Sequence, residues 1–151
     1  PSCADRSISQ LRYEGYRAAL ADRGLAFDPR LLVETGGCFE MPEAYQGAVE
    51  LLDRGADFTA VFTLSDTMAM AVIKALTDRG RRVPEDCSVI AIDGLRMSEY
   101  TVPTLTTMVQ PVEEMGRESV AILMELLREG GQPRHLRLEA RLRQGGSVRR
   151  L

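Results

Sequence analysis

The sequence predicts an α/β fold in which a parallel sheet is flanked by helices. Stretches with apolar residues three and four positions apart, typical of amphipathic helices, alternate along the chain with short β-branched runs bounded by Gly, Pro or Asp. These short runs are almost entirely apolar, which is typical of strands covered on both faces. With 151 residues, 44% of them hydrophobic, the chain is long enough for one ordinary domain and its core.

The first part of the chain predicts two helices and two strands. A helix is expected over 6–23, followed by a strand at 31–33, where three apolar residues stand together. The next helix, over 42–54, has Pro42 in its first turn, a position where the missing N–H is no loss. A strand over 59–62 follows.

A third helix is expected over 66–78, because Ser65 is a good N-cap and Asp66 suits a first turn. Its apolar residues recur at helical spacing up to the stop at Arg79-Gly80. After a break at Pro84, the run 88–92 predicts the next strand.

The last part of the chain predicts a short strand around 105–109 and a helix over 112–129 that ends at Gly130-Gly131. An extended piece is expected near 136–143. No internal repeat and no low-complexity linker interrupts this order.

Polar residues follow two of the predicted strands. Asp93 comes directly after strand 88–92, and Ser65-Asp66 follow the strand that begins at Thr59. Because ligands of open parallel sheets bind at the carboxyl ends of the strands, we expect both clusters to face one cleft. A carboxylate there can accept hydrogen bonds from the hydroxyls of a sugar or a ribose. The alternative is that Asp93-Gly94 forms only a turn.

Arg12 shares a helical row with Ile8, Tyr16 and Leu20, so its guanidinium emerges from the apolar face of the first helix. A buried arginine requires an anion or several acceptors, which a ligand oxygen or a site carboxylate would supply. The alternative is an arginine whose stem covers the core while its head reaches water.

Composition argues against several classes of protein. The net charge of −3 gives no overall attraction for nucleic acid or for an anionic membrane. Three cysteines, Cys3, Cys38 and Cys87, fit neither a disulfide framework nor a zinc site and favour a reducing, cytoplasmic setting. No run is long enough for a membrane span, and the N-terminal residues show no signal segment.

The motifs of common catalytic sites are also missing. The single histidine, His135, has no nucleophile motif nearby, and neither a GxGxxG nor a GxxxxGK[ST] loop occurs. We therefore predict no enzyme, no cofactor and no metal site. The tail "RLRQGGSVRRL" is interpreted as a solvated end. Phe39 and Tyr100 are either platforms for the apolar face of a ligand or core residues.

Three stretches, "QLRYEGYRAAL", "AVFTLSDTMAMAVIKALTDRGRRVPEDCSVIAIDG" and "PTLTTMVQPVEEMGRESVAILMELL", resemble the effector-binding domain of the lactose/galactose repressor (LacI/GalR) family. The resemblance implies a periplasmic-binding-protein-like, Rossmann-like lobe that closes with a second lobe around a sugar or purine. Matched to the family pattern, the ligand-binding residues are Arg12, Phe39, Ser65, Asp66, Asp93 and Gln110. Asn is commoner than Ser at position 65, and the turn before Phe39 departs from the pattern, so the effector is not identified.

The resemblance also implies a domain organisation. Residues 1–104 and 135–149 correspond to the C-terminal lobe, and 105–129 to a strand and helix of the other lobe, which is largely missing. The DNA-binding helix-turn-helix of the family has no counterpart in this chain. Helix 112–129 would then carry apolar side chains without a lobe to cover them, so we expect it to pack back on the lobe, exchange with a second copy or pair symmetrically.

The function implied is that of the effector-sensing and dimerisation domain of a cytoplasmic LacI-type transcriptional regulator, with a small-molecule effector and a homodimeric partner. The alternative is a sugar-binding protein of a transport system, which shares the fold. A third class, an enzyme using Asp66 and Asp93 as acid and base, has no independent support in the sequence.

Overall fold

The computed structural model describes residues 6–36, 39–128 and 131–149. Its four strands form one sheet in the order of the sequence: β1 (Ala60–Phe62), β2 (Ser88–Asp93), β3 (Thr106–Val109) and β4 (Arg141–Arg143). The first three strands are parallel, as the sequence predicts, and β4 is antiparallel to β3. The carboxyl ends of β1 and β2 therefore meet at the same edge of the sheet, where the polar clusters follow them.

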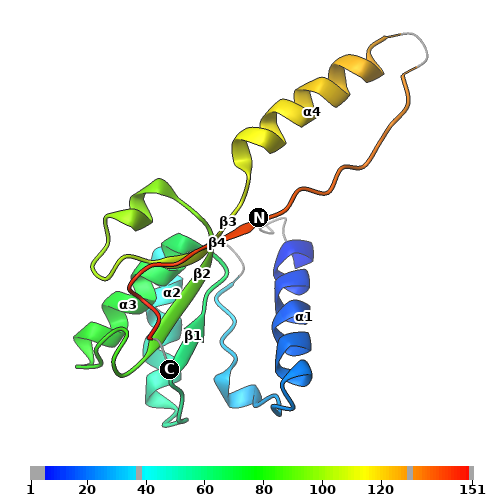
Figure 1. The fold of residues 1–151 in the computed structure, drawn as a ribbon. Coiled ribbons are helices and arrows are strands. Elements are labelled where there is room, and N and C mark those ends of the chain that lie inside the picture. Colours follow the sequence, from blue (N-terminus) through cyan, green and yellow to red (C-terminus); the bar gives the residue numbers. More distant parts are fainter. Residues whose placement is uncertain (1–5, 37–38, 129–130, 150–151) are drawn as a thin grey trace.

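Four α-helices accompany the sheet: α1 (Arg6–Asp22), α2 (Met41–Asp53), α3 (Asp66–Asp78) and α4 (Val112–Leu126). Figure 1 shows α2 and α3 together on one side of the sheet and α1 on the other. The ring of Tyr16 in α1 stacks on that of Phe62 in β1 with 6.3 Å between the centroids. This contact holds α1 near the carboxyl end of β1.

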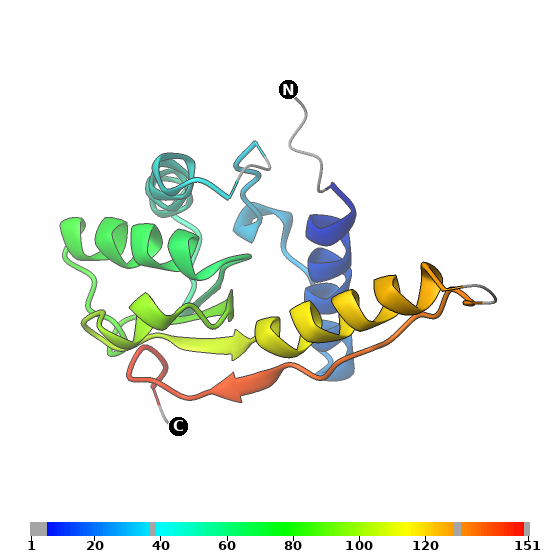
Figure 2. The ribbon, with the colours of Figure 1, turned by 90° about the horizontal axis from the view of Figure 1, so that it is seen from above.

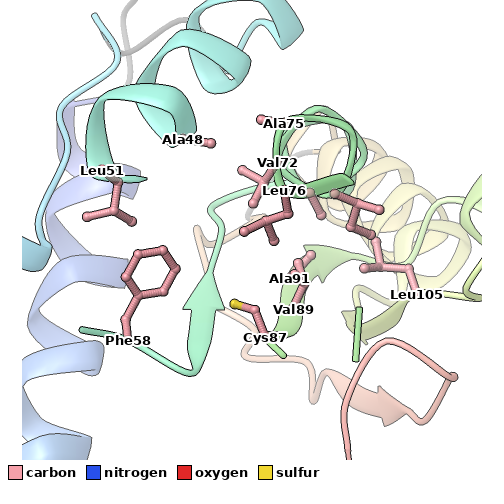
Figure 3. Close-up of a cluster of buried hydrophobic side chains, with 12 residues drawn as sticks. Ala48, Leu51, Phe58, Val72, Ala75, Leu76, Cys87, Val89, Ala91 and Leu105 are labelled. Atoms are coloured by element: carbon pink, nitrogen blue, oxygen red, sulfur yellow. The ribbon is translucent and has the colours of Figure 1, made fainter. Parts of the chain in front are cut away.

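The core lies between α2, α3 and the inner face of the sheet. Val89 and Ala91 of β2 are fully buried against Leu76 of α3, and Leu105 closes the cluster beside β3 (Figure 3). Burying side chains of this size stabilises a fold by roughly 1.5–3 kcal/mol each. The alternate residues of β2 are half-buried, so both faces of the sheet are covered, as the sequence predicts, but the face towards α2 and α3 is covered more completely.

Helix α3 forms where the sequence predicts it. Ser65 has extended backbone angles, and its hydroxyl accepts a hydrogen bond from the backbone N–H of Met68 at 3.1 Å. This is the geometry of an N-cap, which satisfies a donor that the helix itself leaves free. The cap fixes the start of α3 directly after β1.

The strand predicted at 31–33 is wrong. Pro29–Leu31 form a short 3-10 turn whose cap is the carboxylate of Asp28, which accepts from the N–H of Arg30 at 2.9 Å. The guanidinium of Arg54 donates to the carbonyls of Arg30 and Leu32 at 2.9 and 2.6 Å. The turn chemistry of Asp-Pro and these side-chain donors replace strand pairing, although Leu31 and Val33 still pack on the core.

Helix α4 stands away from the sheet beside the returning chain, as both ribbon views show (Figures 1 and 2). Val112, Val120, Leu123 and Leu127 remain 55–74% exposed. The expectation that this helix packs back on the lobe is therefore wrong, whereas exchange or pairing with a second copy stays a prediction. Its other side and the segment 136–140 line a groove of about 360 Å³.

Cys87 is a buried free thiol, whereas Cys3 and Cys38 lie outside the described part of the chain. Within the described ranges, no helix is both long and apolar enough to cross a membrane.

Candidate functional site

Three of the predicted ligand-binding residues meet at the carboxyl ends of the strands. The Nη2 of Arg12 lies 3.7 Å from Oδ1 of Asp93. The same oxygen accepts a hydrogen bond from the side-chain amide of Gln110 at 2.7 Å. Arg12 also donates to the carbonyl of Leu64, which directly precedes Ser65. The structure thus joins α1, the end of β2 and the end of β3 in one polar cluster.

The backbone around Asp93 is strained. Asp93 has a φ of 135°, a region that residues other than glycine rarely adopt. Gly94 follows with a φ of 77°, and a Cβ at this position would lie 2.6 Å from the Cα of Val109. Only glycine permits this approach of the turn to β3. The chain bends at Gly94, but Asp93 itself is the last residue of β2 and pairs with Val109, so it is not only part of a turn, and its backbone directs a carboxylate into the cluster.

Burial raises the pKa of Asp93 above its ordinary value of 3.8, while the charge of Arg12 and the hydrogen bond from Gln110 act in the opposite direction. The side chains of Arg12 and Asp93 are 18% and 26% exposed. Both groups are thus partly withdrawn from water yet still accessible. Such a pair can bind a polar molecule that supplies both acceptors and donors.

Phe39 borders this cluster. The guanidinium carbon of Arg12 lies 5.8 Å from the centroid of its ring, within the range of a cation–π contact. Phe39 is half-buried and packs against the small core cluster of Ala44, Met68 and Ala71, while its ring also adjoins the polar groups as a platform would. Tyr100, the other candidate platform, is 79% exposed and forms no part of the cluster.

Ser65 and Asp66 lie beside the cluster but are buried, with 5% and 0% exposure. Asp66 accepts three hydrogen bonds, from the N–H of Leu95 at 2.7 Å, the hydroxyl of Ser98 at 2.9 Å and the hydroxyl of Thr107 at 2.5 Å. A carboxylate surrounded by protein donors is satisfied without a ligand. The geometry thus favours Asp66 as an internal support, whereas the sequence predicts a ligand contact.

The support of Asp66 extends to β4. Arg143 donates to the Ser98 hydroxyl at 2.5 Å and to Glu99 at 2.6 Å. Ser147 is fully buried and donates to the carbonyl of Val89 at 2.6 Å. The C-terminal tail is therefore not a solvated end along its whole length.

Sequence reasoning missed Ser98, Thr107 and Arg143. Thr107 lies in the stretch "PTLTTMVQP" that carries the family resemblance, but single hydroxyl or arginine residues carry no signal of their partners. The only indication available is the Gly-Gly-Ser turn after Arg143, which brings Ser147 back to the sheet.

Comparisons with known proteins agree with this architecture. The MalR transcriptional regulator of Clostridium butyricum is 36% identical over 138 residues, which is 91% of this chain and 41% of that protein. A sugar-binding transcriptional regulator of the LacI family from Escherichia coli, solved with phosphate, superposes with a TM-score of 0.87 at 33% identity. That match covers 97% of this chain and 52% of the other.

The structure of the regulator CelR with cellobiose matches with a TM-score of 0.84 at 37% identity, over 90% of this chain and 41% of CelR. This chain thus spans about half or less of the length of the proteins it resembles. The family of periplasmic binding protein-like domains matches residues 1–148. The chain therefore belongs to the periplasmic binding protein-like family, and it matches the corresponding part of LacI-family regulators.

Proposed function

We propose that this chain is the effector-sensing part of a LacI-type transcriptional regulator and binds a sugar or a related metabolite through Arg12, Phe39, Asp93 and Gln110. The observation that supports this most is the contact of Arg12 and Gln110 with one oxygen of Asp93. Asp93 then keeps its second oxygen for a ligand hydroxyl, and Phe39 offers an apolar face for a sugar ring. The relatives are regulators, which favours regulation over transport and over enzymatic activity.

Ser65 and Asp66 take part indirectly in this proposal. They position α3 and the turn after Asp93, because their side chains bond to Met68 and to Leu95, Ser98 and Thr107. Neither requires contact with the effector for this role.

The remaining parts of the proposal concern the longer protein. We propose that residues 1–104 and 135–149 belong to one lobe of the effector domain and that 105–129 lead into the lobe that completes it, with β3 still paired in the present sheet and α4 leaving it. The exposed apolar side of α4 supports this division, because such a surface is normally covered. We place the regulator in the cytoplasm as a homodimer, and DNA binds through a helix-turn-helix outside this chain.

Calorimetric titration of the full-length protein tests the binding function. A panel of sugars and nucleosides, with cellobiose among them, is titrated into wild type, Arg12→Ala and Asp93→Ala. At least one compound should bind wild type, and each variant should lose about tenfold or more in affinity, as expected when a charge-assisted hydrogen bond is removed. Unchanged affinities in both variants would contradict the site.

The regulatory part has a separate test. The compound that binds should change the affinity of the full-length protein for its operator DNA by about 5–150-fold, the usual range for coupling between two sites. Fluorescence anisotropy with labelled DNA measures this change. If the compound binds without altering the affinity for DNA, the protein binds a small molecule but does not regulate, which would contradict this part of the proposal.

A further inference from the structure

The hydroxyl of Ser65 is already fully used inside the protein. It accepts a hydrogen bond from the N–H of Met68 at 3.1 Å and lies 2.9 Å from the hydroxyl of Thr67. Either hydroxyl could donate to the other, but the Thr67 hydroxyl also points its proton to the carbonyl of Phe39, and in that arrangement Ser65 is the donor to Thr67. With 5% of the residue exposed, Ser65 has almost no surface to offer a ligand.

Thr67 has the opposite character. It is half-buried, and its hydroxyl has only one further contact, the carbonyl oxygen of Phe39 at 3.5 Å. This distance is well beyond the 2.5–3.0 Å of a normal O–H···O hydrogen bond. When Ser65 donates to Thr67, the proton of Thr67 has, among the described residues, only this long contact with Phe39.

The surroundings of Thr67 connect it to the proposed binding site. Its weak contact is with the backbone of Phe39, and the ring of Phe39 lies under the guanidinium of Arg12 at 5.8 Å. Arg12 in turn contacts Asp93. Thr67 and Arg12 thus adjoin the same aromatic residue, one at its backbone and the other at its ring.

We propose that Thr67, and not Ser65, is the residue of α3 that contacts the effector and determines specificity. Its hydroxyl donates to a hydroxyl or ring oxygen of a sugar, and Ser65 donates to Thr67 from behind. Such a chain of hydrogen bonds, beginning at the N–H of Met68, strengthens the donor at its end. This inference rests on the proposed function and adds a specificity-determining residue to that site.

Two substitutions in the full-length protein test the role of the hydroxyl. Thr67→Val replaces the hydroxyl with a methyl group of nearly the same shape, and Thr67→Ser keeps the hydroxyl. Calorimetry with cellobiose and with D-ribose should show a three- to tenfold lower affinity for Thr67→Val, the usual net effect of one hydrogen bond. Thr67→Ser should remain within about twofold of wild type, as the size of that effect requires.

Thermal unfolding of the same variants separates contact from structure. Thr67→Val removes the acceptor that Ser65 uses at 2.9 Å, so its midpoint should fall, whereas that of Thr67→Ser should stay close to wild type. Affinities are therefore compared well below both midpoints, where every variant is folded. Equal affinities of Thr67→Val and wild type, together with a loss in Arg12→Ala, would overturn this inference and leave the proposed function standing. If neither sugar binds to wild type, both the role of Thr67 and the proposed function, in the form of sugar binding, are overturned.

Discussion

Asp93 accepts a hydrogen bond from the side-chain amide of Gln110 at 2.7 Å, which ties the carboxyl end of β2 to the residue that follows β3. The carboxylate is thereby fixed on one oxygen before any ligand arrives. Its partner Arg12 comes from a helix distant in the sequence and contacts the same oxygen at 3.7 Å. A preorganised site of this kind does not have to order its side chains when it binds, which favours affinity.

Asp93 predicts a characteristic pH dependence. Burial raises its pKa in the folded state, so the folded protein binds the proton more tightly than the unfolded chain does. The stabilising contribution is then complete below the ordinary value of 3.8 and is lost as the pH rises through the folded pKa. Ionised Asp93 thus lowers stability at neutral pH.

Asp93→Asn should therefore raise the unfolding midpoint at pH 7, and its advantage over wild type should shrink as the pH falls towards 3.8. Asn tolerates positive φ, and its carbonyl oxygen can still accept from Gln110. Thermal unfolding followed by circular dichroism between pH 3.5 and 8 is the measurement. A lower midpoint than wild type at pH 7 would show that the carboxylate stabilises the fold.

Replacing Asp66 should lower the stability of the fold, in contrast to replacing Asp93. Asp66→Ala leaves the buried hydroxyl of Thr107 and the N–H of Leu95 without their acceptor, whereas the hydroxyl of Ser98 can still donate to the carbonyl of Leu95 at 2.7 Å. Each unsatisfied group costs about 1–3 kcal/mol, so we expect a loss of about 2 kcal/mol or more in the free energy of unfolding. Urea denaturation measures it, with the exposed Asp22→Ala as a control that should change little. A loss below about 1 kcal/mol would contradict the role as a support.

Gly94→Ala tests the tight approach of the turn to β3. The new Cβ would lie 2.6 Å from the Cα of Val109, and the φ of 77° is unfavourable for alanine. Strain of this kind costs about 1–3 kcal/mol, and relief would require Asp93 to shift. We expect both lower stability and weaker effector binding. Gly24→Ala, with a φ of 66° and nothing within 4 Å, should lower stability alone.

Substitutions on the exposed side of α4 should have different effects in this chain and in the longer protein. Val120 and Leu123 are 61% and 55% exposed, so Val120→Glu with Leu123→Glu should leave the unfolding midpoint of the 151-residue chain nearly unchanged. In the full-length protein, where we propose that the other lobe covers these side chains, the loss should reach about 3–6 kcal/mol. Equal effects in both proteins would contradict the division into lobes.

The sequence predicts the elements whose signals are local. The helix over 66–78 is correct because Ser65 can cap it regardless of tertiary structure. The strand at 31–33 is wrong because Arg54, from another element, takes the carbonyls that a strand would pair. Local apolar content alone cannot reveal such a competitor.

The contrast between local signals and long-range contacts also explains which parts of the site the sequence can predict. Arg12 and Asp93 can be placed together because strand ends and helix faces follow from the periodicity and from the family resemblance. The different surroundings of Asp66 and Asp93 do not follow, since both are aspartates at the ends of neighbouring strands. Only the three donors packed around Asp66 separate the two, and these come from β3 and from the turn after β2.

The central claim is that Arg12 and Asp93 act together in one effector site, and a double-mutant cycle on effector binding tests it most directly. Calorimetry on wild type, Arg12→Ala, Asp93→Ala and the double variant gives the coupling free energy. Residues in contact show couplings of about 0.5–3 kcal/mol, whereas distant residues are additive within about 0.5 kcal/mol. We predict a coupling of at least about 1 kcal/mol. Additive losses, or no loss in either single variant, would contradict the account.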